Sequence, residues 1–167
     1  TLKLKASRKN NISFDYGVAS GDPTNTNIIL WTKVTPKLNK DITIKWQLSA
    51  DKNFKNILNS GLVSAKYSND FTVKADVSVP NAFRGNKVFY RFLLNDTFSD
   101  TGVTKTLPQN NPNQYNIAFC SCSNHPAGYF NAYREIAKNK DIDLVLHLGD
   151  YIYEYATDGY ATEDSER

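Results

Sequence analysis

The chain has 167 residues, of which 40% are hydrophobic and 22% charged, and it carries a formal net charge of +3. This composition is typical of a folded protein and excludes intrinsic disorder as the main state. The small net charge, without a Lys/Arg cluster among stacking aromatic residues, argues against a nucleic-acid-specific module. No stretch approaches the roughly 20 apolar residues that span a bilayer. Because the sequence starts at Thr1, has no Met and shows no signal peptide, we expect a processed or trimmed product.

The first two thirds of the chain show strand patterns. Residues 1–11 form a basic stretch that we expect to be a solvated arm. Between residues 12 and 107, apolar and polar residues alternate with the period of a half-buried strand at 42–48, 73–79 and 88–92. Short strands separated by turn signals, without helical periodicity, predict an antiparallel β-sandwich.

Two further strands of this sandwich are expected earlier in the chain, at 14–19 and 28–34, with the turn-rich segment 20–25 between them. The two tryptophans, Trp31 and Trp46, are expected to lie in the sandwich core. The alternative is that one of them stacks against a sugar.

The pattern changes after a Pro/Asn-rich linker at 108–114. A strand at 115–121, a helix that starts near Pro126 and a buried strand at 142–146 predict a β-α-β unit, which belongs to a parallel sheet. One such unit cannot build that sheet alone. The second domain, 115–167, therefore looks like the incomplete start of an α/β domain.

Three residues follow the ends of the two predicted parallel strands. Cys122 ends the first strand, Asp150 comes just after the second, and Tyr153 lies three residues further on. Ligand sites in open α/β sheets lie at the carboxyl ends of the strands, so these side chains are expected to converge there. Carboxylate and tyrosinate favour a hard, highly charged cation such as ferric iron over zinc, and together with the thiolate they make a plausible set of ferric ligands. Taken singly, each residue also has a purely structural interpretation: a buried thiol, a turn cap and half-buried packing.

Other polar residues near these strand ends are ambiguous. His147 is either a hydrogen-bonding partner of the metal ligands or a satisfied core histidine. Asn124 and His125 face either the cleft or open solvent. Cys120 is expected in the core, and a disulfide with Cys122 is not expected on geometric grounds, because one residue separates the two cysteines on a single strand.

These blocks resemble a known family. FCSC at 119–122, GYFNAYR at 128–134 and DLVLHLGDYIYEY at 143–155 are similar to the alkaline phosphatase D (PhoD-like) metallophosphatases, as are FDYGVASGDP at 14–23 and ILWTKV at 29–34. The resemblance implies a fibronectin-III-like N-terminal sandwich, followed by the first β-α-β unit of a metallophosphatase domain.

The resemblance also implies roles for residues. Cys122 and Tyr153 would bind a ferric ion (Fe³⁺), and Asp150 would bridge it to calcium (Ca²⁺). The family hydrolyses phosphodiesters and phosphomonoesters, commonly as periplasmic or secreted proteins, with a metal-held hydroxide attacking phosphorus. Most calcium ligands have no counterpart in this chain. We therefore expect the isolated chain to be inactive. The missing calcium ligands are expected to come from the remaining part of the protein, which could be a separate chain.

Two other hypotheses compete with a phosphoesterase. In one, the sandwich is a binding module and the β-α-β segment only packs against it. In the other, the chain is a fragment without independent function, whose open sheet edge is covered by another chain.

Overall fold

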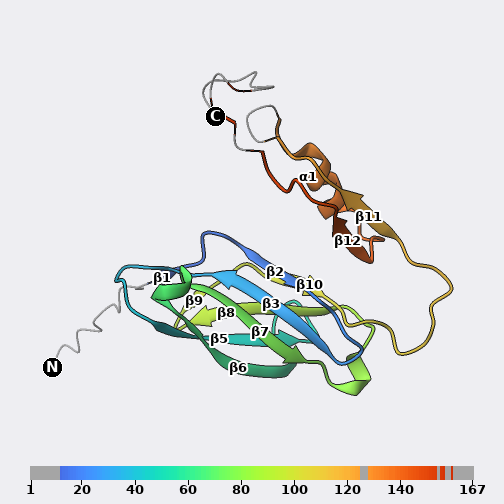
Figure 1. The fold of residues 1–167 in the computed structure, drawn as a ribbon. Helices are drawn as coiled ribbons and strands as arrows, with labels where there is room; N and C mark the ends of the chain where they lie inside the picture. The colour runs from blue at the N-terminus through green and yellow to red at the C-terminus, as the bar shows by residue number, and fades with distance from the viewer. Residues whose placement is uncertain (1–11, 125–127, 154, 157–158, 160–167) are drawn as a thin grey trace. The chain divides into compact units, whose positions relative to one another are not determined.

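The structure is a computed structural model that describes residues 12–124, 128–153, 155–156 and 159. It divides into two compact units, Thr1–Asn111 and Pro112–Arg167, which are treated separately below (Figure 1). The expected N-terminal arm, Pro126 at the expected helix start, and His125 lie outside the described residues.

The described part of the first unit consists of strands and two short 3₁₀ turns. The strands are β1 (Ile12–Ser13), β2 (Val18–Gly21), β3 (Asn27–Lys33), β4 (Thr35–Pro36), β5 (Ile42–Ser49), β6 (Ile57–Ala65), β7 (Thr72–Ser78), β8 (Val88–Leu94), β9 (Thr97–Phe98) and β10 (Gly102–Thr104), and the turns are Tyr67–Asn69 and Asn81–Phe83. The predicted strands at 42–48, 73–79 and 88–92 match β5, β7 and β8 within two residues.

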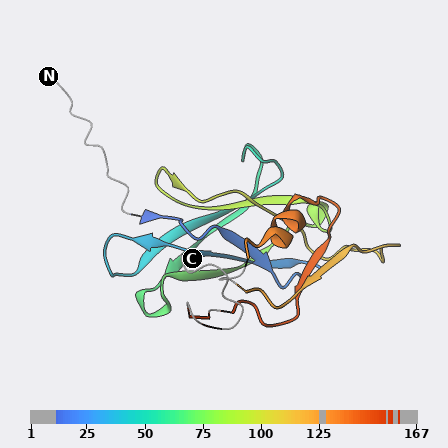
Figure 2. The same cartoon turned by 90° about the horizontal axis from the view of Figure 1, so that it is seen from above.

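Two antiparallel sheets form the body of this unit. One has the order β2-β3-β7, and the other has the order β10-β8-β5-β6 with β9 paired to β8 (Figures 1 and 2). Alternate side chains of each strand point inward, and those from both sheets form a single apolar core. The large residues that are almost fully buried come from both sheets and include Ile28, Leu30, Ile44, Leu48, Val77, Val88 and Phe92.

The first sheet departs from the prediction at two places. The expected strand at 14–19 is wrong in its extent, because β1 ends at Ser13 and β2 begins at Val18, with a turn at Gly17 where φ is +67°. Trp31 is also not a core residue. It pairs with Ala19 and Lys74 on the outer face of the sheet, since the neighbours Leu30 and Thr32 take the inward positions of β3. Trp46 lies in the core.

The second unit contains β11 (Ile117–Cys120), α1 (Asn131–Lys138) and β12 (Leu144–His147). The two strands pair in parallel, from Ile117 opposite Leu144 to Cys120 opposite His147. Both strands are shorter than expected, partly because the Asp143 carboxylate accepts the backbone N–H of Asn116 at 2.9 Å just before the pairing begins.

The strand at 142–146 was expected to be buried, and this prediction is wrong for the described residues. Leu144, Val145 and Leu146 are 38%, 47% and 42% exposed. A sheet of two strands offers two faces, and α1 is the only helix in the described part of this unit that can cover either of them.

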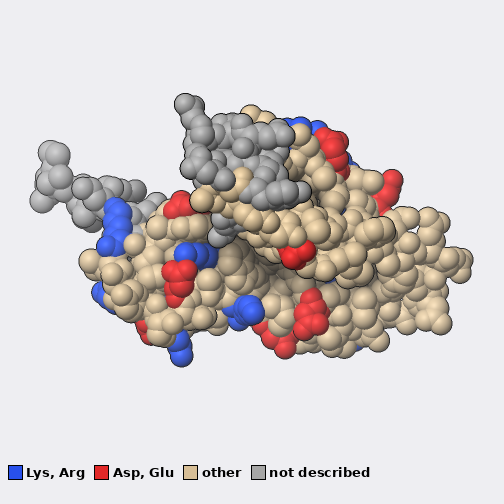
Figure 3. All heavy atoms as spheres, turned by 45° about the horizontal axis from the view of Figure 1, so that its top comes forward, with Lys and Arg blue, Asp and Glu red and all other residues tan. Residues whose placement is uncertain are grey.

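On the face shown in Figure 3, acidic and basic side chains are interspersed and form no continuous basic stripe. Among the described residues, no helix is long and apolar enough to cross a membrane.

Candidate metal centre

The backbone keeps the two strand-end segments together after β11 and β12 end. Four hydrogen bonds continue the pairing: Leu148 N–H to Cys120 O (2.8 Å), Cys122 N–H to Gly149 O (3.4 Å), Ser123 N–H to Asp150 O (3.2 Å) and Tyr153 N–H to Ser123 O (2.7 Å). Asn124 and Tyr153 form a further parallel bridge. Residues 122–124 therefore run beside residues 149–153, so the parallel pairing of β11 and β12 continues past the ends of both strands.

Three residues in these segments adopt left-handed backbone conformations. The φ angles of Cys122 and Asp150 are +58° and +45°, and that of Gly149 is +110°. Such angles are uncommon for residues with a side chain and recur at functional sites. Here they turn the backbone at the point where Cys122 and Asp150 approach each other.

The three side chains predicted as metal ligands lie next to one another. Cys122 Sγ is 3.7 Å from Asp150 Oδ2, and Tyr153 Oη is 3.9 Å from Cys122 Sγ. Hydrogen bonding to Asp150, followed by partial burial and the contact with Cys122, raises the pKa of the Tyr153 phenol well above its usual value. The phenol therefore holds its proton between two groups that can carry negative charge.

This donor set fits a hard, highly charged cation. A cation would replace the phenolic proton and offset the repulsion among three anionic donors. No Lys or Arg among the described residues forms an ion pair with Asp150. The described part of the chain also contains no cluster of three or more His, Cys, Asp or Glu side chains that could hold a metal. The candidate centre thus consists of one thiol, one carboxylate and one phenol, and these residues present no separate calcium site.

Of the two predicted supporting residues, Asn124 pairs with Tyr153 of this cluster, whereas the hydrogen bonds of His147 go to Tyr133 and to Gly149, the residue before Asp150. His147 Nε2 lies 2.9 Å from the Tyr133 hydroxyl, and its Nδ1 accepts the Gly149 N–H at 3.3 Å. The Asn124 Oδ1 atom is buried and has no hydrogen-bond partner among the described residues. An acceptor of this kind is costly to leave unpaired, so it is available to a ligand or a bound water.

Two contributors were not identified from the sequence. The Tyr133 hydroxyl also contacts Ser123 Oγ, which places both residues beside the cluster. In the sequence, Tyr133 lies among apolar residues at helical spacing, and its hydroxyl is the one signal of a polar role. Cys120, expected in the core, is only half-buried and lies 3.8 Å from the carbonyl oxygen of Leu146, and both cysteines are free thiols.

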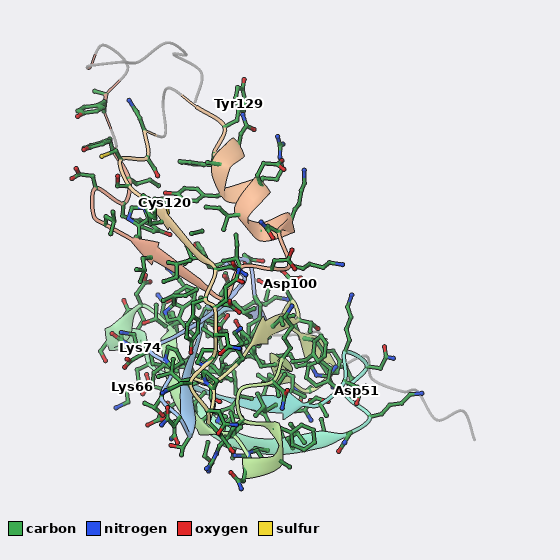
Figure 4. All side chains as sticks on the ribbon, turned by 90° about the vertical axis from the view of Figure 1, so that its right-hand side faces the viewer. Asp51, Lys66, Lys74, Asp100, Cys120 and Tyr129 are labelled. Atoms are coloured by element: carbon green, nitrogen blue, oxygen red, sulfur yellow. The ribbon has the colours of Figure 1, made fainter. Side chains whose placement is uncertain are left out.

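An open hollow of about 380 Å³ adjoins the candidate centre. Its wall comes from the segment after β11 and from the start of α1, as the positions of Cys120 and Tyr129 in Figure 4 illustrate. The lining residues are Cys120, Ser121, Cys122, Ser123, Asn124, Gly128, Tyr129, Phe130, Asn131, Ala132 and Tyr133. The hollow places Cys122 and Ser123 on a surface that a small polar ligand can reach.

The chain thus combines a β-rich first unit with a parallel strand pair that carries a thiol, a carboxylate and a phenol at its ends. Family comparisons identify it further. Residues 1–108 match the family described as PhoD-like phosphatase, N-terminal domain, and residues 117–167 match the family described as PhoD-like phosphatase. The chain belongs to the PhoD-like phosphatase family.

Two relatives support this assignment. The chain is 39% identical over 160 residues to alkaline phosphatase D of Bacillus subtilis (strain 168), covering 90% of this chain and 27% of the relative. A solved structure described as "Structure of PhoD" matches with a TM-score of 0.78 and 36% identity, over 86% of this chain and 29% of that one. The chain therefore spans about a quarter of the length of these relatives.

Proposed function

We propose that the protein to which this chain belongs is a metal-dependent phosphomonoesterase and phosphodiesterase. The observation that carries the proposal is the cluster of Cys122, Asp150 and Tyr153 in a chain of the PhoD-like phosphatase family. In this proposal Cys122, Asp150 and Tyr153 would hold Fe³⁺, and Asp150 would also serve as a ligand of Ca²⁺. These cations would supply Lewis acidity toward the phosphoryl oxygens and lower the pKa of water.

The chain's own residues contribute binding and orientation. The backbone ladder between 122–124 and 149–153 fixes the thiol and the carboxylate at one edge of the strand pair. The hollow beside Cys122 offers room for a phosphate ester, and the unpaired Asn124 Oδ1 at its border is an acceptor that would suit a cation or a water molecule. The ligands that these residues do not provide are proposed to come from the remaining part of the protein, on the same or a separate chain.

The resemblance to the family, rather than any feature of the fold, supports two further parts of the proposal. The sandwich is proposed to be fibronectin-III-like, and the protein to act in the periplasm or as a secreted enzyme. The proposed substrate is a phosphate ester, and an assay with a monoester and a diester defines which of the two the enzyme prefers.

Paired cysteine variants test the proposed centre. The whole protein, loaded with iron and calcium, should hydrolyse p-nitrophenyl phosphate and bis-p-nitrophenyl phosphate. Cys122→Ser should lower kcat/KM by about 100-fold or more, because losing even an outer partner of a metal ligand costs about 10–100-fold. Cys120→Ser removes the other thiol, which lines the hollow but lies outside the three-residue cluster, so this variant should keep its iron and lose much less activity than Cys122→Ser.

Metal analysis of the same samples identifies the cause of any loss. Cys122→Ser should also lower the bound iron measured by elemental analysis. Full activity and full iron content in Cys122→Ser would contradict the role of this thiol. A wild-type protein that carries both metals and hydrolyses neither ester would contradict the proposed function itself.

A further inference from the structure

A continuous chain of side-chain hydrogen bonds runs from β12 to the wall of the hollow. His147 Nε2 contacts the Tyr133 hydroxyl at 2.9 Å, and the same hydroxyl contacts Ser123 Oγ. The three residues come from β12, α1 and the segment after β11. All three are partly buried, so water competes for these hydrogen bonds less than it would at the surface.

The backbone sets the direction of this chain. The Gly149 N–H can only donate, so His147 Nδ1 accepts it at 3.3 Å. A neutral imidazole then carries its proton on Nε2 and donates it to the oxygen of Tyr133. The Tyr133 hydroxyl in turn donates its own hydrogen to Ser123 Oγ.

Ser123 is therefore left with a hydroxyl hydrogen that the chain does not use. No other described residue is hydrogen-bonded to Ser123 Oγ. Ser123 lines the hollow directly after Cys122. An acceptor oxygen in the hollow would find this hydrogen already oriented, because the Ser123 oxygen is held from behind by Tyr133.

We propose that Ser123 donates a hydrogen bond to a phosphoryl oxygen in the hollow, and that Tyr133 and His147 are positioning residues that orient it. The inference rests on the proposed function, because it takes the phosphate ester as the occupant of this hollow. A hydroxyl is suited to this part, since it can give its hydrogen to a phosphoryl oxygen while it accepts one from Tyr133.

Inorganic phosphate is the probe for the binding step. Its dissociation constant, measured by calorimetry on the whole protein with iron and calcium, should rise about tenfold in Ser123→Ala, the loss typical of a hydrogen bond to a charged group. Ser123→Thr keeps the hydroxyl and should restore most of the affinity. Tyr133→Phe should weaken binding by about threefold, because the Ser123 hydroxyl remains but is no longer oriented.

The double variant distinguishes a relay from general damage to the fold. If Tyr133 acts through Ser123, then Ser123→Ala with Tyr133→Phe should bind phosphate as Ser123→Ala does alone. Losses that multiply would overturn the relay. Tyr151→Phe is the matched control, because it removes a hydroxyl outside the chain and keeps the ring that lies 4.9 Å from His147. It should leave phosphate binding unchanged.

A measurement without metal tests the direction of the chain. Nitrogen-15 NMR of this polypeptide should show the His147 proton on Nε2, with a changed Nε2–H signal in Tyr133→Phe. A proton on Nδ1 would overturn the inference. Wild-type affinity in Ser123→Ala of an active protein would overturn it while leaving the proposed function intact, whereas an inactive metal-loaded wild type would contradict the proposed function.

Discussion

The two units of the chain bury their apolar side chains to very different degrees. In the first unit, Phe92 is fully buried between two sheets. In the second, Phe119 on β11 is 71% exposed and Leu148 after β12 is 66% exposed. Two packed sheets provide inner faces for alternating strands, whereas a pair of parallel strands with one helix leaves most of its apolar surface in water. The first unit is therefore stabilised by its own core.

The candidate centre belongs to the unit with the weaker core. Its Cys122, Asp150 and Tyr153 are held by backbone hydrogen bonds between two strand-end segments rather than by buried packing. A cation that binds the folded arrangement and not the unfolded chain would stabilise it by mass action. Metal binding is therefore expected to stabilise the second unit, whereas the sandwich has a buried apolar core that supplies its stability.

The largest loss of stability is expected from removing a buried aromatic ring, because the two units differ most in how far they bury such rings. Phe92→Ala removes a fully buried ring and should lower the free energy of unfolding by about 3–5 kcal/mol, since a cavity remains in the core. Phe119→Ala removes an exposed ring and should change it by less than about 0.5 kcal/mol. Urea unfolding of this chain, followed by far-ultraviolet circular dichroism, measures both. A large loss in Phe119→Ala would show that the second unit has a core of its own.

The sequence predicts the sandwich strands best where one face is apolar and the other polar. β5 and β7 follow that rule, because inward and outward positions alternate with period 2, whereas β8 follows it only in part, since Phe89 and Arg91 both take its outward positions. β3 does not, since Ile29 and Trp31 are apolar residues on its outer face, and the tryptophan was therefore assigned to the wrong side. Strands of two residues, such as β1 and β9, are too short to show any period.

At the candidate centre, the parallel direction of the two strands predicted more of the contacts than the chemistry of the side chains did. Two consecutive parallel strands bring their carboxyl ends together, so the approach of Cys122 to Asp150 follows from the β-α-β pattern. The contact of Tyr133 with His147 depends on how α1 packs beside the strands. Helical spacing indicates which face of α1 is covered, but not which polar atom a hydroxyl on that face will meet.

A second prediction tests how tightly the sandwich is packed. A Cβ atom added at Gly102 on β10 would lie 2.2 Å from the ring of Tyr90, which is only 2% exposed and has little room to move. Gly102→Ala should therefore cost about 1–3 kcal/mol of stability through overpacking. Gly21→Ala is the matched control on β2, because nothing lies within 4 Å of its added Cβ. Equal urea midpoints for the two variants would show that the core of the first unit accommodates an added methyl group. The two units would then differ less in packing than the exposed fractions suggest.

The smallest effect is expected at a turn of the sandwich that is held by one carboxylate. Asp51 accepts the backbone N–H groups of Asn56 at 2.7 Å, Asn53 at 2.9 Å and Lys55 at 3.3 Å. These hydrogen bonds, that from Asn56 above all, hold the pKa of the Asp51 carboxyl below its usual value of 3.8. A lowered pKa in the folded state contributes stability above the unfolded-state pKa, and this contribution is lost as pH falls through the folded-state value.

Asp51→Asn should accordingly lower stability modestly at pH 7. The difference from the wild type should shrink as pH falls below 3.8, because the carboxyl becomes protonated first in the unfolded chain and, at still lower pH, in the folded protein. Tryptophan fluorescence in urea reports this unit selectively, because both tryptophans of the chain, Trp31 and Trp46, lie in it. Asp96→Asn is the control, since that exposed carboxylate accepts no hydrogen bond from the described residues. A difference that stays constant from pH 7 to pH 3 would mean that Asp51 supports the turn by shape and not by charge. In that case the stability of this turn of the sandwich would not depend on an ionised group, whereas the candidate centre consists of groups that can ionise.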